Sequence, residues 1–378
     1  MRSATYGMLS TYPPTQCGLA TFTAALGTHL VGVGASGPVG VVRLVERPQC
    51  TSPPEVVHEF VKGSPASRKA AVARLNAFDT VIVQHEYGIY GGPDGDEVVA
   101  VLNALTVPVI VVLHTVLVNP TAHQRVVLEA VVDAADAAVT MTRTAYRRLR
   151  DYRVDLRKAS VIPHGAHVPS SVTAPRLDAG RPTILTWGLL GPGKGIEWGI
   201  EALAQLAHLR PAPRYLVVGK THPKVLEHQG EEYRTSLQVR AAELGVSDLV
   251  EFNASYLSLA ALEGIVRDAD VVLLPYDSPD QVTSGVLIEA VAAGKPVISS
   301  RFPHAVELLG EGPGLLVPHR SPQAIATALA QVLTDHELRR AMAEWSAQMA
   351  PQLGWPAVAG QYRALAARVR ATHVPNVA

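Results

Sequence analysis

The sequence predicts two Rossmann-like, doubly wound α/β domains that face a central cleft. Short β-branched runs alternate with helical patterns from end to end, as in parallel sheets with crossover helices. The runs are mostly continuous rather than alternating, which is expected of parallel strands buried on both faces. The apolar pattern lapses at 167–182, where Ser, Thr, Ala, Pro and Gly replace it, and we interpret that segment as the linker between the domains.

The predicted strands fall into two sets. In the first half they are Val39–Val45, Val81–Gln84, Val107–His114, Ala137–Thr140 and Ser160–Pro163. In the second half they are Thr183–Trp187, Arg214–Gly219, Leu249–Asn253, Val271–Pro275, Pro296–Ser300 and Gly314–Val317. Amphipathic helices fill the intervals, and in Ser321–Leu333 the first residue can cap the helix while Pro322 occupies its first turn. The apolar face of that helix consists of Ala324, Ile325, Ala328, Leu329, Val332 and Leu333.

The length supports this division. At 378 residues the chain is about two and a half times the ~150 residues of a typical domain. We place the first domain at 1–170 and the second at 171–353, with 354–378 as a C-terminal segment. The carboxyl ends of parallel strands line the ligand site of such domains, so residues at those ends are the candidates for function.

Composition excludes several classes of protein. Lys and Arg number 33, as do Asp and Glu, so the formal net charge is zero and a dedicated nucleic-acid binder is excluded. The longest apolar run, Val107–Leu113, is far shorter than the ~18 residues of a membrane span. No signal-peptide pattern opens the chain, so we expect a cytoplasmic protein. Cys17 and Cys50 are too few for a disulfide framework, and the histidines lack metal-ligand spacing, so we expect no metal site.

Two glycine-rich segments imitate phosphate-binding loops. Gly32–Gly37 spells G-x-G-x-x-G, but a helical pattern at Thr21–Val31 precedes it and a strand follows, the reverse of a dinucleotide-binding unit. Gly188–Lys194 has the Walker A spacing and follows a strand, but Gly195 stands where that motif needs a hydroxyl for magnesium. The second segment is therefore predicted to be a turn with one lysine at a helix start, suited to hold a diphosphate without a dedicated metal.

A second cluster follows the predicted strand Val271–Pro275. Thr283, Ser284 and Gly285 open a helix there, so their N–H groups can face an anion. Glu289 lies about one and a half turns further along, on a mainly apolar face where an unpaired carboxylate would be costly. It is predicted either to bind a ribose diol or to be a core glutamate bonded to a neighbouring loop.

Polar residues also end the strands of the first half. His114 closes one strand and is either a site residue or a satisfied strand-end histidine. His85 and Glu86 follow another strand and either touch an acceptor or belong to an ordinary loop. The basic run Arg143–Lys158 is either the solvated face of a helix or a weak peripheral contact with anionic lipid or a phosphorylated acceptor.

Several motifs occur in an order that resembles one known family. Gln281-x7-Glu289 and Gly294–Val297 resemble its Glu-x7-Glu and the Gly-Lys-Pro-Val that follows, and Gly188-Leu189-x4-Lys194-Gly195 resembles its Gly-Arg-x4-Lys-Gly. Further similar segments are Cys17–Phe22, Leu113–Thr115, Ile162–Ala166, Glu307 with Gly314–Val317, and Trp355 with Tyr362. Over essentially its whole length, the chain resembles the retaining GT-B glycosyltransferases of family 4, also called glycosyl transferases group 1.

The resemblance implies a metal-independent hexosyltransferase without a cofactor. It would move mannose or glucose from a GDP- or UDP-linked donor, with retention, to a hydroxyl of a carbohydrate, lipid or small-molecule acceptor. Residues 354–378 would form a helix that crosses back to the first domain. The implied roles are diphosphate binding by Gly18, Gly188, Lys194, Thr283, Ser284 and Gly285, ribose binding by Glu289, and sugar contacts by Gln281 and His114. His114, Lys194 and Gln281 would be the catalytic residues.

Two positions depart from the family pattern. Leu189 replaces an arginine, so one of two phosphate cations is missing, and Gln281 replaces the first glutamate. A glutamine can hydrogen-bond hydroxyls, but it cannot act as a carboxylate nucleophile or stabilise an oxocarbenium ion by charge. The alternatives are therefore a nucleotide-binding protein without transfer activity, or a sugar-nucleotide epimerase or phosphorylase on the same fold.

Overall fold

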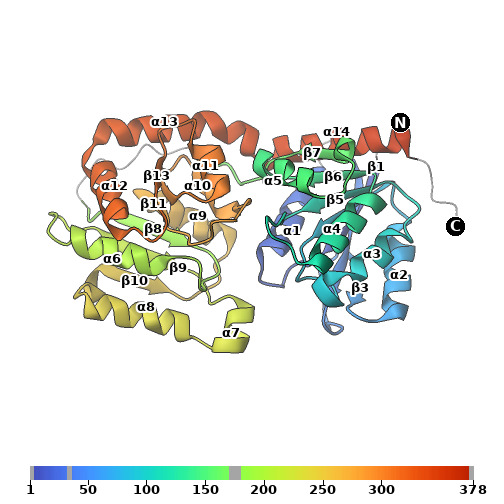
Figure 1. The fold of residues 1–378 in the computed structure, drawn as a ribbon, viewed down its shortest axis with the longest axis horizontal. Coiled ribbons are helices and arrows are strands. Elements are labelled where there is room, and N and C mark those ends of the chain that lie inside the picture. The colour runs from blue at the N-terminus through green and yellow to red at the C-terminus, as the bar shows by residue number, and fades with distance from the viewer. Residues whose placement is uncertain (1–3, 32–35, 170–179, 374–378) are drawn as a thin grey trace. The chain divides into compact units, whose positions relative to one another are not determined.

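A computed structural model describes residues 4–31, 36–169 and 180–373 (Figure 1). The chain forms two compact units, one of residues 1–165 with 355–378 and the other of residues 166–354. Most of the predicted linker, including the predicted boundary between residues 170 and 171, lies outside the described residues, as does most of the Gly32–Gly37 segment. Each unit is built on its own parallel sheet.

The sheet of the first unit has the strand order β3-β2-β1-β4-β5-β6-β7. Its strands are β1 (Ala4–Ser10), β2 (Ser36–Val45), β3 (Val56–Val61), β4 (Thr80–His85), β5 (Val109–Leu113), β6 (Ala137–Thr140) and β7 (Ala159–Val161). Its α-helices are α1 (Gly18–Leu30), α2 (Pro65–Leu75), α3 (Glu97–Leu102), α4 (Ala122–Ala134), α5 (Arg143–Arg148) and α14 (Trp355–Thr372). The order reverses between β1 and β4, so the loops after these two strands flank the switch point of the sheet.

One core of this unit joins segments from both ends of the chain. Alternate residues of the central strands, such as Met8 and Ile82, pack with Phe22 of α1 and with Tyr362 of α14. On the opposite face, Leu75 of α2 approaches β1 closely. The helix that starts at Trp355 is thus part of the hydrophobic core of the first unit.

The sheet of the second unit has the strand order β10-β9-β8-β11-β12-β13. Its strands are β8 (Thr183–Trp187), β9 (Arg214–Val218), β10 (Val250–Asn253), β11 (Val271–Leu274), β12 (Val297–Ser300) and β13 (Leu315–Val317). Its helices are α6 (Ile196–Leu206), α7 (Pro223–Gln229), α8 (Glu232–Glu243), α9 (Leu259–Asp268), α10 (Gly285–Ala292), α11 (Pro303–Leu309), α12 (Pro322–Thr334) and α13 (His336–Leu353). The order reverses between β8 and β11.

Helices cover both faces of this second sheet, as Figure 1 shows. One core contains buried residues of α6, α8 and α12, and the other contains residues of α9, α10 and α11. The predicted cap of α12 is confirmed, because Ser321 Oγ accepts a hydrogen bond from Ala324 N at 3.4 Å and Pro322 stands in the first turn. The doubly wound α/β class predicted for both units is confirmed.

Three expectations need correction. The strands β1 and β3 were not predicted, although β1 is central in its sheet. Helix α1 begins at Gly18 rather than Thr21. The basic run is not one helix, because α5 ends at Arg148 and short 3₁₀ turns follow at Leu149–Asp151 and Leu156–Lys158. Several of its cations are engaged locally: Arg157 pairs with Asp155 at 2.8 Å.

A lipid bilayer could not be crossed by any helix in the described parts of the chain, because none combines the necessary length and apolarity.

Candidate active site

The loops at the switch point of the second sheet pack against each other. The loop after β8 contains Gly188 and Lys194, and the loop after β11 leads into α10. Asp277 N and Ser278 Oγ both donate to Gly193 O, at 2.9 and 3.3 Å. The two predicted phosphate-binding segments are therefore brought together at the place where doubly wound sheets bind ligands.

Glycine is required where these backbones touch. Gly195 has φ +63°, and a Cβ there would lie 1.9 Å from Pro275 O. Gly219, after β9, has φ +142°, and its Cβ would lie 1.9 Å from Gly188 O. Both positions have a positive φ, and in both a Cβ would clash with a backbone carbonyl oxygen. No larger residue therefore fits.

Lys194 provides the positive charge of this site. Its Nζ lies 4.3 Å from the centre of the Tyr276 ring, within the range of a cation–π contact. Tyr276 is 1% exposed and stacks on Phe302, so the lysine packs against a buried aromatic pair. Lys194 as a whole is half-buried, and an ammonium group can bind a phosphate.

Glu289 has the hydrogen-bonded partner that its location required. Trp187 Nε1, at the end of β8, donates to Glu289 Oε2 at 3.2 Å. Burial raises the pKa of Glu289 to about 7, and the indole hydrogen bond opposes that rise. The carboxyl group can therefore titrate near neutral pH and can accept hydrogen bonds from vicinal hydroxyls when ionised.

The start of α10 differs from the expectation at one amide. Ser284 N donates to Nδ1 of the buried His304 at 2.8 Å, and is not available to an anion in this structure. A buried N–H needs a partner, and the imidazole of α11 supplies it. Ser284 Oγ caps the helix by accepting from Leu287 N at 3.2 Å. Among the described residues, the hydroxyl of Thr283 is buried without a partner.

Gln281 is turned toward its own loop. Its Nε2 donates to Thr283 O at 2.9 Å. The amide therefore stabilises the segment that precedes α10, and Oε1 remains as its acceptor for a ligand. Gly188 lies close to α10, since a Cβ there would lie 3.6 Å from Val286 Cγ2.

In the first unit, His114 is held by a neighbouring strand. Its Nε2 lies 2.7 Å from Gln84 Oε1, and its ring meets Phe22 edge-on with centroids 5.1 Å apart. Burial, and then the neighbouring His164 and His85, lower the pKa of His114 to about 3. The imidazole is therefore neutral across the physiological range.

The predicted acceptor residues have different surroundings. His85 is only 1% exposed, neither ring nitrogen has a partner among the described residues, and burial lowers its pKa to about 4. His85 is the last residue of the buried strand β4 rather than a residue of the loop that follows it. Glu86 accepts from Thr115 Oγ1 at 2.6 Å and from Tyr87 N at 3.0 Å.

Gly18 is the first residue of α1, directly after the loop that follows β1. Cys17 occupies the N-cap position of α1, and no heavy atom lies within 4 Å of the place where a Cβ on Gly18 would be. A buried arginine supports this loop: Arg43 Nη1 donates to Pro13 O at 3.1 Å, and its guanidinium pairs with Glu59. There is thus free space beside the first residue of α1, and Arg43 holds the backbone of the preceding loop.

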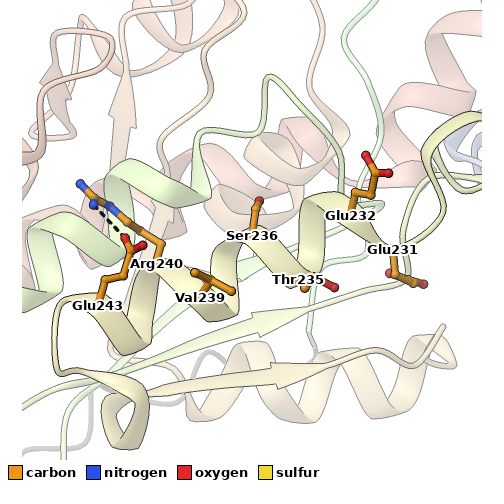
Figure 2. Close-up of a pocket in the computed structure, with 7 residues that line it drawn as sticks. All are labelled: Glu231, Glu232, Thr235, Ser236, Val239, Arg240 and Glu243. Carbon is orange, nitrogen blue, oxygen red and sulfur yellow. Dashed lines mark hydrogen bonds and ion pairs between the residues drawn. The ribbon is translucent and has the colours of Figure 1, made fainter.

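A hollow on the surface of α8 is not part of this arrangement. Figure 2 shows its lining residues, which include an ion pair between Arg240 and Glu243 at 3.3 Å. All of them belong to α8 or to its N-cap residue, and none is a predicted site residue. Within the described ranges, no group of three or more His, Cys, Asp or Glu side chains could hold a metal ion.

Four residues that contact predicted site residues were not themselves predicted: Gln84, Trp187, Tyr276 and His304. Trp187 and Gln84 lie at or next to the carboxyl end of a strand. The same position made His114 a candidate site residue, so the sequence could have indicated both. Tyr276 directly follows the predicted strand Val271–Pro275 and carries the same signal, whereas His304 carries none, because only the folded loops bring it to Ser284.

The chain is similar in sequence to known glycosyltransferases. Residues 171–349 match the family model described as glycosyl transferases group 1. The D-inositol 3-phosphate glycosyltransferase of Kineococcus radiotolerans is 31% identical over 61% of this chain and 57% of its own. The phosphatidyl-myo-inositol mannosyltransferase of Mycolicibacterium smegmatis is 28% identical over 53% of this chain and 49% of its own. The matched region thus spans about half the length of these curated relatives.

Solved structures share the fold. Sucrose-phosphate synthase from Thermosynechococcus elongatus has a TM-score of 0.78 and 20% identity, covering 98% of this chain and all of that one. Anabaena HepE, crystallised with UDP and glucose, has a TM-score of 0.72 and 16% identity, covering 97% of this chain and all of that one. Residues 171–349 are therefore similar to the glycosyl transferases group 1 family, and the two Rossmann-like units share the GT-B fold of the solved structures.

Proposed function

We propose that the protein is a retaining glycosyltransferase that transfers a hexose from a nucleoside-diphosphate sugar to an acceptor hydroxyl. The observation that carries this proposal is that Lys194 and Glu289 follow β8 and β11, the two strands at which the order of the second sheet reverses, within the region that matches the group 1 family model. The lysine can neutralise a diphosphate, and the glutamate can bind a ribose diol. UDP in the HepE structure supports a uridine-linked donor, and a GDP-linked donor is the second candidate.

In the proposed reaction, the bond between the anomeric carbon and the diphosphate oxygen breaks while the acceptor oxygen bonds to the same face of that carbon. The acceptor proton leaves with the diphosphate. Negative charge therefore develops on the leaving group, and Lys194 together with the free amides at the start of α10 would stabilise it. Gln281 Oε1 and His114 would accept hydrogen bonds from sugar hydroxyls. No metal is required for these steps.

The names of the relatives suggest an acceptor class. One is a D-inositol 3-phosphate glycosyltransferase and another a phosphatidyl-myo-inositol mannosyltransferase. We therefore propose a polyol, with or without a phosphate or lipid attached, as the first acceptor to test. Mannose and glucose are the first donor sugars to test.

The experiment is a transfer assay with purified protein. UDP- and GDP-linked glucose and mannose are each incubated with inositol 3-phosphate, with and without EDTA, and products are analysed by mass spectrometry and by NMR of the anomeric proton. We expect one donor to give an α-linked product at the same rate in EDTA. Nucleotide binding without release of nucleoside diphosphate would favour the alternative without transfer, and an epimerised donor would favour the epimerase.

A further inference from the structure

Gln84 is a buried polar residue that the proposed chemistry does not yet use. It lies in β4, is 0% exposed, and is fixed on its backbone side because Tyr90 Oη donates to Gln84 O at 2.6 Å. Its side-chain amide faces the ring of His114, which follows the neighbouring strand β5. The backbone is joined one residue further along, since His114 N donates to His85 O at 3.1 Å.

The contact between the two side chains determines the tautomer of the imidazole. Gln84 Oε1 lies 2.7 Å from His114 Nε2, and an amide oxygen can only accept a hydrogen bond. With Oε1 as the atom that faces the ring, Nε2 carries the proton. In a neutral ring the other nitrogen, Nδ1, then carries only a lone pair, and no hydrogen bond to Nδ1 is present among the described residues.

The surroundings keep the ring neutral. Burial is the main cause of the low pKa, and the titratable groups that act on His114 are His164 and His85. Burial also lowers the pKa of each of these to about 4, so neither carries a charge at neutral pH. The edge contact with Phe22 adds an apolar wall on the side of α1.

We propose that Gln84 is a positioning residue that holds His114 as a hydrogen-bond acceptor, with its bare Nδ1 available to a hydroxyl of the donor sugar. This inference rests on the proposed function, in which His114 contacts that sugar. It assigns His114 the role of orienting the substrate and excludes the role of a general acid, because a neutral ring protonated only at Nε2 has no proton to give from Nδ1.

The substitution Gln84→Glu tests the role without changing the shape of the side chain. A carboxylate opposite Nε2–H favours the imidazolium, so the pKa of His114 rises and Nδ1 gains a proton as the pH falls. We expect kcat of Gln84→Glu to fall at least tenfold from pH 8 to pH 6. In the wild-type protein, the His114 imidazole should cause no fall in kcat over this pH range. Tyr90→Phe is the matched control, since it removes a contact to the Gln84 backbone and leaves the amide in place.

A spectroscopic measurement decides the point independently of turnover. In protein labelled with ¹⁵N-histidine, the His114 signals are those that vanish in His114→Gln. We expect a protonated Nε2 and an unprotonated Nδ1 from pH 5.5 to pH 8, and a titration within this range in Gln84→Glu. A proton on Nδ1 of the wild-type ring at neutral pH would overturn the inference, as would an unshifted titration in the variant. Failure of the wild-type protein to transfer any sugar would instead count against the proposed function, and the tautomer result would stand.

Discussion

The indole N–H of Trp187 and the carboxylate of Glu289 meet at 3.2 Å, joining the end of β8 to the middle of α10. The two residues are 102 positions apart in the sequence. They connect the glycine-rich loop that carries Lys194 to the helix whose start faces the same site. This contact links the two halves of the proposed donor site. Burial raises the pKa of the same carboxyl group to about 7, against the opposing effect of the indole hydrogen bond.

The stability of the protein should depend on the ionisation of Glu289. Its folded pKa of about 7 exceeds the unfolded value of 4.5, so the folded state binds more protons between these pH values. The free energy of unfolding should therefore fall as the pH rises from about 4.5 to 7. The loss amounts to roughly 3 kcal/mol at most, since one pKa unit corresponds to about 1.4 kcal/mol. Glu289→Gln should lack this component, which urea titrations at pH 5 and pH 8 would measure.

Nucleotide binding should favour the ionised form of Glu289, whereas folding favours the protonated form. If ribose hydroxyls donate to the ionised carboxylate, nucleotide binding releases a proton and affinity rises between pH 6 and pH 8. Calorimetry with UDP or GDP in two buffers of different ionisation enthalpy would detect the proton. An affinity that is the same in wild type and Glu289→Gln at every pH would remove the carboxylate from the ribose site.

Lys194→Ala should impair turnover much more than stability. Loss of a preorganised charge on the leaving group typically lowers kcat by about 100- to 1,000-fold. The cation–π contact with Tyr276 contributes only about 0.5–1 kcal/mol to folding. Initial rates with the active donor, together with thermal unfolding, would separate the two effects. Lys69→Ala, on the exposed surface of α2, removes a lysine elsewhere and should retain wild-type kinetics. Equal kinetics in both variants would refute the assignment.

Gly18→Ala should weaken donor binding without destabilising the fold. The position has open space around a Cβ, so alanine is tolerated in the free protein. A diphosphate that approaches the start of α1 would meet the added methyl group, and we expect KM for the donor to rise at least tenfold. Gly360→Ala, in the interior of α14, is the matched control and should raise the melting temperature slightly without changing KM. A wild-type KM in Gly18→Ala would show that no ligand approaches this glycine.

Arg43→Met should destabilise the first unit. The arginine is 1% exposed, and its removal leaves Glu59 without its charged partner and Pro13 O without its donor. Breaking a buried pair from one side costs about 3–5 kcal/mol, and the partial exposure of Glu59 favours the lower end. Equilibrium unfolding in urea provides the measurement. The double variant Arg43→Met/Glu59→Met should recover part of the loss, whereas additive losses would mean that the pair is not the cause.

Missed strands show where local sequence is an insufficient guide. In β1, Gly7 weakens the strand pattern, yet a Cβ there would lie 2.9 Å from Phe78 Cδ2, so packing requires the glycine. In β3, polar residues such as His58 and Glu59 interrupt the apolar run, as is usual for a strand at the edge of a sheet. Propensity describes one segment at a time, whereas these strands are selected by their neighbours.

The amino-acid sequence by itself determined the α/β class, most of the strands, and the glycine-lysine turn and helix start of the candidate donor site. These features depend on short-range patterns: continuous apolar runs, capping residues and glycines at turns. Only the tertiary structure decided three hydrogen bonds. Trp187 donates to Glu289, the Ser284 amide donates to His304, and the Gln84 side chain faces His114. Such contacts join residues from different strands and helices, and they arise where burial compels a polar group to find a partner, whatever its distance along the chain.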